Sequence, residues 1–143
     1  MRCDGLKGDL VVFSCGTREA AVLSQALGWS STYREAVDRT AADATADHLW
    51  TSLGSDQPDE GPSSAEGSLI DSIHCTGDTV VLQLEHKSVR RIVPILNPLV
   101  NGLLVWEWEF RTLTGYDRGE MRDVFNVLHL CAVTSKPDLP SLD

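Results

Sequence analysis

The spacing of apolar residues changes near residue 69, and this change constrains the fold more than any other feature of the chain. Before it, apolar residues recur about every 3.6 residues, which is the repeat of an amphipathic helix. After it, they alternate with polar residues, which is the repeat of a strand with one buried face. Helices and strands separated in this way along one chain are typical of an α+β fold.

Helix-start signals accompany the helical spacing in three segments. Thr32 and Glu35 have the spacing of a capping box, in which each side chain satisfies a free backbone N–H at a helix start, and Asp117 and Glu120 repeat that spacing. Thr17 is suited to cap the earliest of the helices. We therefore expect helices over about residues 18–28, 33–53 and 118–132.

Short polar turns between alternating segments predict an antiparallel sheet. We expect its strands over residues 10–13, 69–75, 79–86, 89–96 and 103–111. Pro94 has no N–H to donate to a neighbouring strand, so the strand that contains it should lie at an edge of the sheet or be bulged. An open edge can pair with a second copy of the chain, and a homodimer through this edge is one expectation.

Together these elements predict a single α+β domain over residues 1–136 of the 143-residue chain. The expected order is β-α-α-β-β-β-β-α, with a four- to five-stranded, mainly antiparallel sheet and helices packed on one face. Residues 54–68 are rich in Gly, Pro, Ser and acidic side chains, so we expect a mobile acidic loop there. Residues 137–143 include two prolines and are expected to form a flexible tail.

Negative charge is concentrated in one part of the chain. Residues 31–68 contribute a net −6 of the total net charge of −9. This distribution argues against direct binding of nucleic acid, which needs clustered cations, and favours a basic protein partner. Trp29 and Trp50 lie near expected helix ends, where exposure is expected. The residues that we expect to bind the partner are Asp43, Asp47, Asp56, Asp59, Glu60 and Trp50. A run of acidic residues is equally typical of an ordinary solvated surface.

Cysteine and histidine positions do not predict a metal or cofactor site. Cys3, Cys15, Cys75 and Cys131 are scattered without a CxxC pair, which is typical of free thiols in a reducing compartment. His74 neighbours Cys75 and would point to the opposite face of a strand. The chain has no apolar stretch of membrane-spanning length, and its start lacks the apolar region of a signal peptide. We therefore expect a cytoplasmic location, without cofactor, metal or membrane contact.

Two features superficially suggest catalysis. Cys15 ends an expected strand and precedes a helix start, where the helix dipole favours a thiolate, but no base can be assigned to it. Glu107 and Glu109 share one face of an expected strand, like the paired carboxylates of a hydrolase, although any solvated strand offers the same spacing. Trp106 and Trp108 alternate with them and are expected to pack in the core. We interpret Cys15 as a buried structural residue.

Two functional hypotheses from different classes follow. The first is a non-catalytic acidic protein-binding module, such as an inhibitor or immunity protein that neutralises a basic toxin. The second is a small-molecule binder or an enzyme that uses Cys15. The expected element order resembles that of helix-grip folds of the START and Bet v 1 type, which implies an apolar ligand held between sheet and helix. This resemblance covers the order of elements and no motif.

Overall fold

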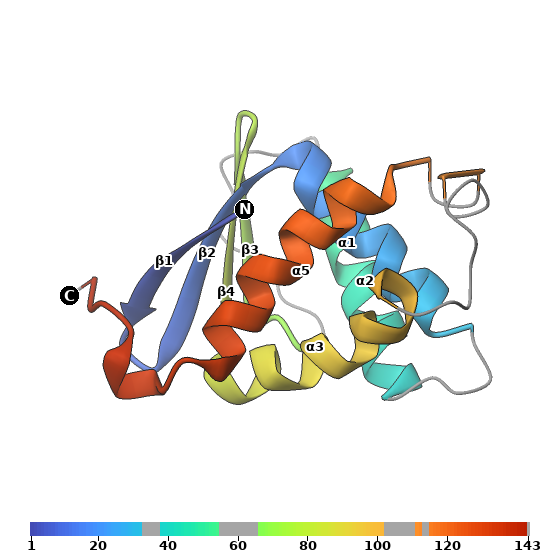
Figure 1. The fold of residues 1–143 in the computed structure, drawn as a ribbon. Coiled ribbons are helices and arrows are strands. Elements are labelled where there is room, and N and C mark those ends of the chain that lie inside the picture. The colour runs from blue at the N-terminus through green and yellow to red at the C-terminus, as the bar shows by residue number, and fades with distance from the viewer. Residues whose placement is uncertain (33–37, 55–65, 102–110, 113–114, 143) are drawn as a thin grey trace.

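The computed structural model describes residues 1–32, 38–54, 66–101, 111–112 and 115–142 (Figure 1). The named elements of these residues, in chain order, are β1 (Arg2–Lys7), β2 (Leu10–Gly16), α1 (Thr17–Ser30), α2 (Arg39–Leu53), β3 (Ser72–Thr76), β4 (Thr79–Glu85), α3 (His86–Val100), α5 (Arg118–Val133) and the 3₁₀ turn η1 (Lys136–Asp138).

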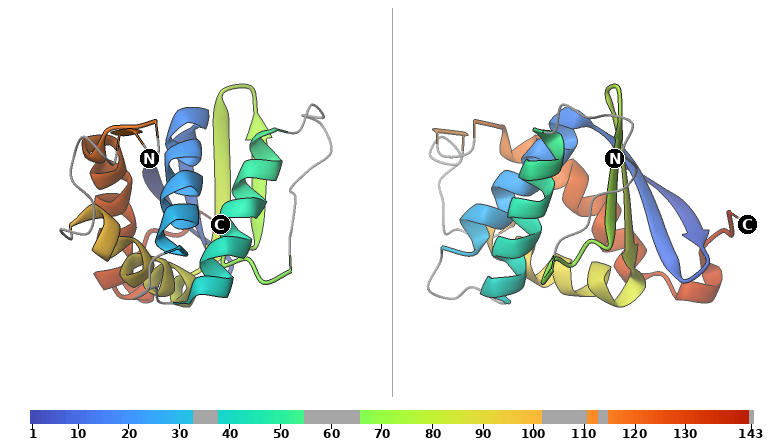
Figure 2. Two further views of the ribbon diagram at one scale, coloured as in Figure 1. Left: turned by 90° about the vertical axis from the view of Figure 1, so that its right-hand side faces the viewer. Right: turned by 180° about the vertical axis from the view of Figure 1, so that it is seen from behind.

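The four described strands form one antiparallel sheet in the order β1-β2-β4-β3, which confirms the α+β class and the antiparallel sheet. One face of the sheet is apolar because alternate residues of paired strands point to the same side. Phe13 lies opposite Leu82, and both are buried. Figure 2 shows the helices gathered against the sheet from two further directions. Their apolar stripes and the apolar sheet face share one buried cluster.

The helices over residues 17–30 and 118–133 agree closely with those predicted over residues 18–28 and 118–132. Glu19 accepts the N–H of Gly16 at 3.1 Å, so Gly16, one residue before the predicted Thr17, is the N-cap of α1. Asp117 and Glu120 form the predicted capping box of α5, in which Glu120 accepts the N–H of Asp117 at 3.0 Å. The first helix continues past Gly28, where we expected its end, to Ser30.

The strand predicted over residues 89–96 is wrong, because these residues belong to helix α3. Val89, Ile92, Leu96 and Leu99 are buried on one side of this helix, at a spacing of three or four residues. We predicted a strand from alternating apolar and polar residues, but the spacing of the buried residues fits a helix. Pro94 is exposed within α3. The argument for a sheet edge at Pro94 is therefore wrong as well.

Segments near both ends of the chain lie at one edge of the sheet. Residues 2–7, which carry too few apolar side chains to predict a strand, form β1 at one edge of the sheet. Part of the segment that we expected to be a flexible tail lies along this edge. The N–H of Leu6 donates to the carbonyl of Pro140, and the N–H of Leu142 donates to the carbonyl of Leu6, both at 2.7 Å.

The second predicted helix begins later than expected. Asp38 has a positive φ of 49°, and α2 starts after it at Arg39, so the helix does not run continuously from residue 33. Gly54 ends α2 as predicted. The interiors of two predicted segments, the acidic loop at 55–65 and the strand over 103–111 as far as residue 110, lie outside the described residues, as does Glu35 of the proposed capping box.

Candidate functional site

Three of the predicted partner-binding residues lie together on α2. Asp43, Asp47 and Trp50 follow one another at four and three residues, which places them on one side of the helix. All three are exposed, and the side chain of Trp50 is 56% exposed. The other predicted residues of this site, Asp56, Asp59 and Glu60, lie outside the described part of the chain, as do Trp106, Glu107, Trp108 and Glu109.

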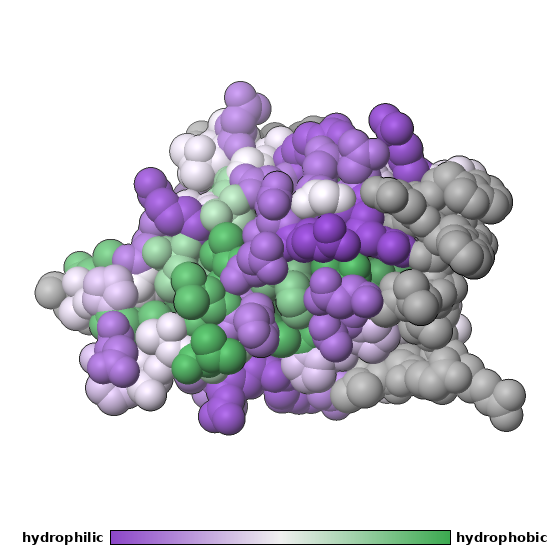
Figure 3. All heavy atoms as spheres, viewed as in Figure 1, coloured by the Kyte–Doolittle hydropathy of each residue, from purple (hydrophilic) through white to green (hydrophobic). Residues whose placement is uncertain are grey.

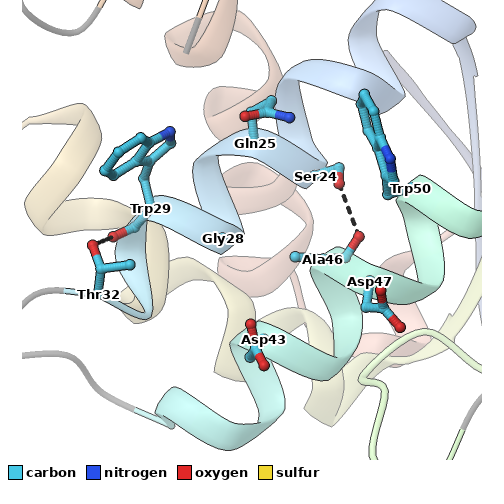
Figure 4. A pocket seen from close by; sticks show the side chains of 9 residues that line it. All are labelled: Ser24, Gln25, Gly28, Trp29, Thr32, Asp43, Ala46, Asp47 and Trp50. Carbon is cyan, nitrogen blue, oxygen red and sulfur yellow. Dashed lines mark hydrogen bonds between the residues drawn. The ribbon is translucent and has the colours of Figure 1, made fainter. Parts of the chain in front are cut away.

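The exposed side of α2 forms one wall of a groove, which we call the α1–α2 groove. Its volume is about 340 Å³, and it is open to solvent. It is lined by Ser24, Gln25, Gly28, Trp29, Thr32, Asp43, Ala46, Asp47 and Trp50 (Figure 4). The two indole rings stand toward opposite ends of the groove, and both carboxylates lie on α2, with Asp47 at the end where Trp50 lies.

Small residues bring the two helices close together at the bottom of the groove. The hydroxyl of Ser24 donates to the carbonyl of Ala46 at 2.8 Å, and this bond is buried. A Cβ atom added to Gly28 would lie 3.9 Å from the Cβ atom of Ala46, so larger side chains at this crossing would separate the helices. The close approach brings the backbone of α2, which carries both aspartates, next to α1, which carries Trp29.

The groove has the chemistry of a site for a cation. Asp43 and Asp47 supply exposed hydrogen-bond acceptors, and none of the described residues that line the groove is a Lys or an Arg. Trp29 and Trp50 supply aromatic faces, which attract ammonium and especially guanidinium groups. A planar guanidinium can donate to a carboxylate and stack on an indole at the same time.

Trp29 and Gln25 were not among the predicted partner-binding residues. The sequence placed Trp29 near a helix end, and this is the signal that could have identified it. Its partnership with α2 could not be read from the sequence, because it depends on how the two helices cross. The acidic residues were easier to find, since their clustering is visible in the charge distribution alone.

Cys15 is buried, with 6% of its surface exposed. Burial raises the pKa of its thiol from 9.0 to about 11, and the neighbouring N-terminal ammonium offsets this only in part. The thiol is therefore protonated near neutral pH, despite its place before a helix. A shallow surface pocket next to it is lined by Met1, Arg2, Ser14, Gly16, Glu19 and Thr79, none of which is a histidine. This setting fits a structural cysteine.

A second groove lies between α3 and α5, and we call it the α3–α5 groove. Its volume is about 490 Å³, and its lining includes His86, Arg90, Val93, His129 and Val133. Leu130 and Val133 on α5 are 67% and 65% exposed. Figure 3 shows apolar side chains gathered on this side of the molecule. Its histidine, arginine and apolar side chains distinguish it from the acidic α1–α2 groove, and no pattern in the sequence predicted it.

The described residues contain no group of three or more His, Cys, Asp or Glu side chains that could hold a metal ion. No helix within the described ranges combines the length and apolar character needed to cross a membrane.

Comparison with protein-family models, with curated proteins and with solved structures finds no match for this chain.

Proposed function

We propose that the protein is a non-catalytic protein-binding module whose α1–α2 groove holds a cationic side chain of a basic partner. The observation that carries this proposal is that two exposed carboxylates, Asp43 and Asp47, and two indoles, Trp29 and Trp50, line one open groove. A small acidic inhibitor or immunity protein that neutralises a basic toxin would bind in this way. The groove favours arginine over lysine, because only a guanidinium is planar.

The charge of the whole chain supports the same partner. A net charge of −9 attracts a basic protein over several ångströms and repels nucleic acid. The groove then supplies the short-range contacts, since exposed carboxylates alone contribute little binding energy. The four cysteines are free thiols, which is compatible with a reducing compartment, and we propose a cytoplasmic location.

The alternative functions have less support. A helix-grip domain needs a cavity between sheet and helices, whereas Phe13, Leu23, Leu82 and Ile92 are large side chains that are fully buried in the core. An enzyme that uses Cys15 needs a thiolate, which burial disfavours. A homodimer through a sheet edge would use β3, because residues 140–142 bond to part of β1 at the other edge.

Peptide binding tests the proposal. We expect a fluorescently labelled octa-arginine peptide to bind more tightly than octa-lysine, measured by fluorescence anisotropy at low salt, and to weaken as salt is added. Replacing both Asp43 and Asp47 by Asn should weaken octa-arginine binding about tenfold, which corresponds to roughly 1.4 kcal/mol and to two partly exposed ion pairs. Adding Trp50→Ala to this variant should weaken octa-arginine binding further, and adding Trp29→Ala should also weaken it.

A matched control separates the groove from overall charge. Replacing Asp71 and Asp123 by Asn removes the same amount of negative charge outside the groove. Both residues are exposed; Asp71 directly precedes β3, and Asp123 lies on α5. This variant should lose much less than the groove variant. An equal loss in the two double variants would show that only the net charge attracts the peptide, and the proposed groove would be rejected.

A further inference from the structure

The four cysteines fall into two pairs, and the geometry of the two pairs differs. Cys15 and Cys75 are neighbours across the sheet, and Cys3 and Cys131 are neighbours between β1 and α5. In both pairs one thiol contributes to the raised pKa of the other, Cys75 to that of Cys15 and Cys3 to that of Cys131. The four thiols are free in the structure.

Cys15 and Cys75 lie too far apart to be joined. Each of them pairs with Val80, Cys15 from β2 and Cys75 from β3, so the whole of β4 separates them. Two strand spacings correspond to about 9–10 Å between the Cα atoms. A disulfide needs Cα atoms within about 7 Å. The thiol of Cys75 instead donates to the carbonyl of Ser52 at 3.6 Å.

Cys3 and Cys131 have no strand between them. Cys3 lies opposite Phe13 in the β1–β2 pair, so its side chain points to the same apolar face as the buried Phe13. Cys131 is buried on the side of α5 that also buries Phe125 and Leu128. The thiol of Cys3 lies close enough to Cys131 to add to the rise in its pKa that burial causes. Helix α5 packs against β1, and Cys3 is packed against the core cluster that contains Cys131, so the two cysteines lie on facing surfaces of these elements.

We propose that Cys3 and Cys131 are a modification site that forms an intramolecular disulfide with a low-molecular-weight disulfide such as oxidised glutathione. Cys3 is half-buried and reacts first, because Cys131 is buried. The thiolate of Cys3 attacks one sulfur of oxidised glutathione and releases one glutathione thiolate. The thiolate of Cys131 then attacks the sulfur of Cys3, forms the new S–S bond and releases the second glutathione. Two protein thiols are oxidised, one glutathione disulfide is reduced to two thiols, and the protons of the protein thiols pass to solvent or to the released glutathione.

This bond would join the first strand to the last long helix. It closes a loop that contains almost the whole chain, and loop closure stabilises a fold more when the loop is long. The α1–α2 groove contains neither cysteine. The inference is therefore independent of the proposed function, and peptide binding in the groove should be the same in both redox states. Burial raises the pKa of Cys131 to about 12, so closure should be slow near neutral pH and faster at alkaline pH.

Intact-mass spectrometry and non-reducing peptide mapping test the proposal on the full chain. After incubation of the reduced protein with excess oxidised glutathione, we expect a monomer that has lost two hydrogen atoms, with Cys3 linked to Cys131. The melting temperature of this species should be higher than that of the reduced protein by roughly 5 °C or more. Adding dithiothreitol should reverse both changes.

Variants provide the matched controls. Cys3→Ser should abolish the intramolecular disulfide. Cys75→Ser should leave the disulfide unchanged, because Cys75 is too far from Cys15 to form a disulfide with it. The peptide map of the unmodified chain decides the question even if a variant fails to fold. The proposal is overturned if the chain keeps a glutathione on Cys3, if the map joins other cysteines or separate molecules, or if all thiols stay reduced.

Discussion

Replacing Gly5 by Ala is the most informative test of how the fold is closed at β1. Gly5 has a φ of +131°, a conformation that residues with a side chain rarely adopt, and a Cβ atom there would lie 2.3 Å from the carbonyl oxygen of Pro140. The carbonyl belongs to the backbone, so the segment around Pro140 must move away. The two hydrogen bonds between Leu6 and this segment would then be lost.

The cost of this substitution has two parts. The unfavourable φ contributes ~1–3 kcal/mol. Loss of the two backbone hydrogen bonds contributes about 1 kcal/mol each. We therefore expect Gly5→Ala to lower the free energy of unfolding by ~3–5 kcal/mol in the full chain, as measured by urea denaturation.

Removing residues 139–143 isolates the second part. In that shortened background there is no Pro140 to displace, so Gly5→Ala should cost only the ~1–3 kcal/mol of the backbone conformation. The two backgrounds should thus differ by about 2 kcal/mol, which is the coupling between position 5 and the C-terminal segment. An equal cost in both backgrounds would refute the contact between this segment and β1.

Two further predictions concern the core. Burial raises the pKa of Cys15 from 9.0 to about 11, so the stability that its protonated thiol contributes is complete below pH 9 and is lost as the pH rises toward 11. Over this range the free energy of unfolding of the unmodified chain should fall by ~2–3 kcal/mol more than that of Cys15→Ala. Parallel pH profiles of the two proteins would contradict this prediction. The buried hydroxyl of Thr45 accepts the N–H of Leu69 at 2.8 Å, so Thr45→Val should cost ~1–3 kcal/mol in chemical denaturation, while Thr45→Ser, which keeps the hydroxyl, should cost less; the reverse order would show that the methyl group matters more than the bond.

Local patterns in the sequence predicted the elements whose signals are strong and close together. The capping box at Asp117 and Glu120 predicted the start of α5, and the turn around Gly77 between two alternating segments predicted the β3–β4 pair. These signals depend on hydrogen bonds and side-chain spacing within a few residues. A sequence therefore carries these signals without any knowledge of tertiary packing.

The failures had two causes, namely an element that depends on a distant partner and a local pattern that was assigned to the wrong period. Arg2–Lys7 has little apolar character of its own and becomes a strand by pairing with β2. Pro94 suggested a sheet edge, yet α3 accommodates it on an exposed side while Ile92 and Leu96 remain buried. At the candidate site, the charge of Asp43 and Asp47 was visible in the sequence. The pairing of α2 with Trp29 was not, because it depends on the crossing of two helices at Gly28 and Ala46.

The central claim is that the α1–α2 groove receives a cationic side chain. The most direct test is an NMR titration of the ¹⁵N-labelled chain with the octa-arginine peptide. We expect the indole N–H signals of Trp29 and Trp50 to shift together with the amide signals of residues 43–50. Trp→Phe variants would be used to assign the two indole signals. Shifts that centre on the α3–α5 groove, or that spread evenly over all acidic residues, would contradict it.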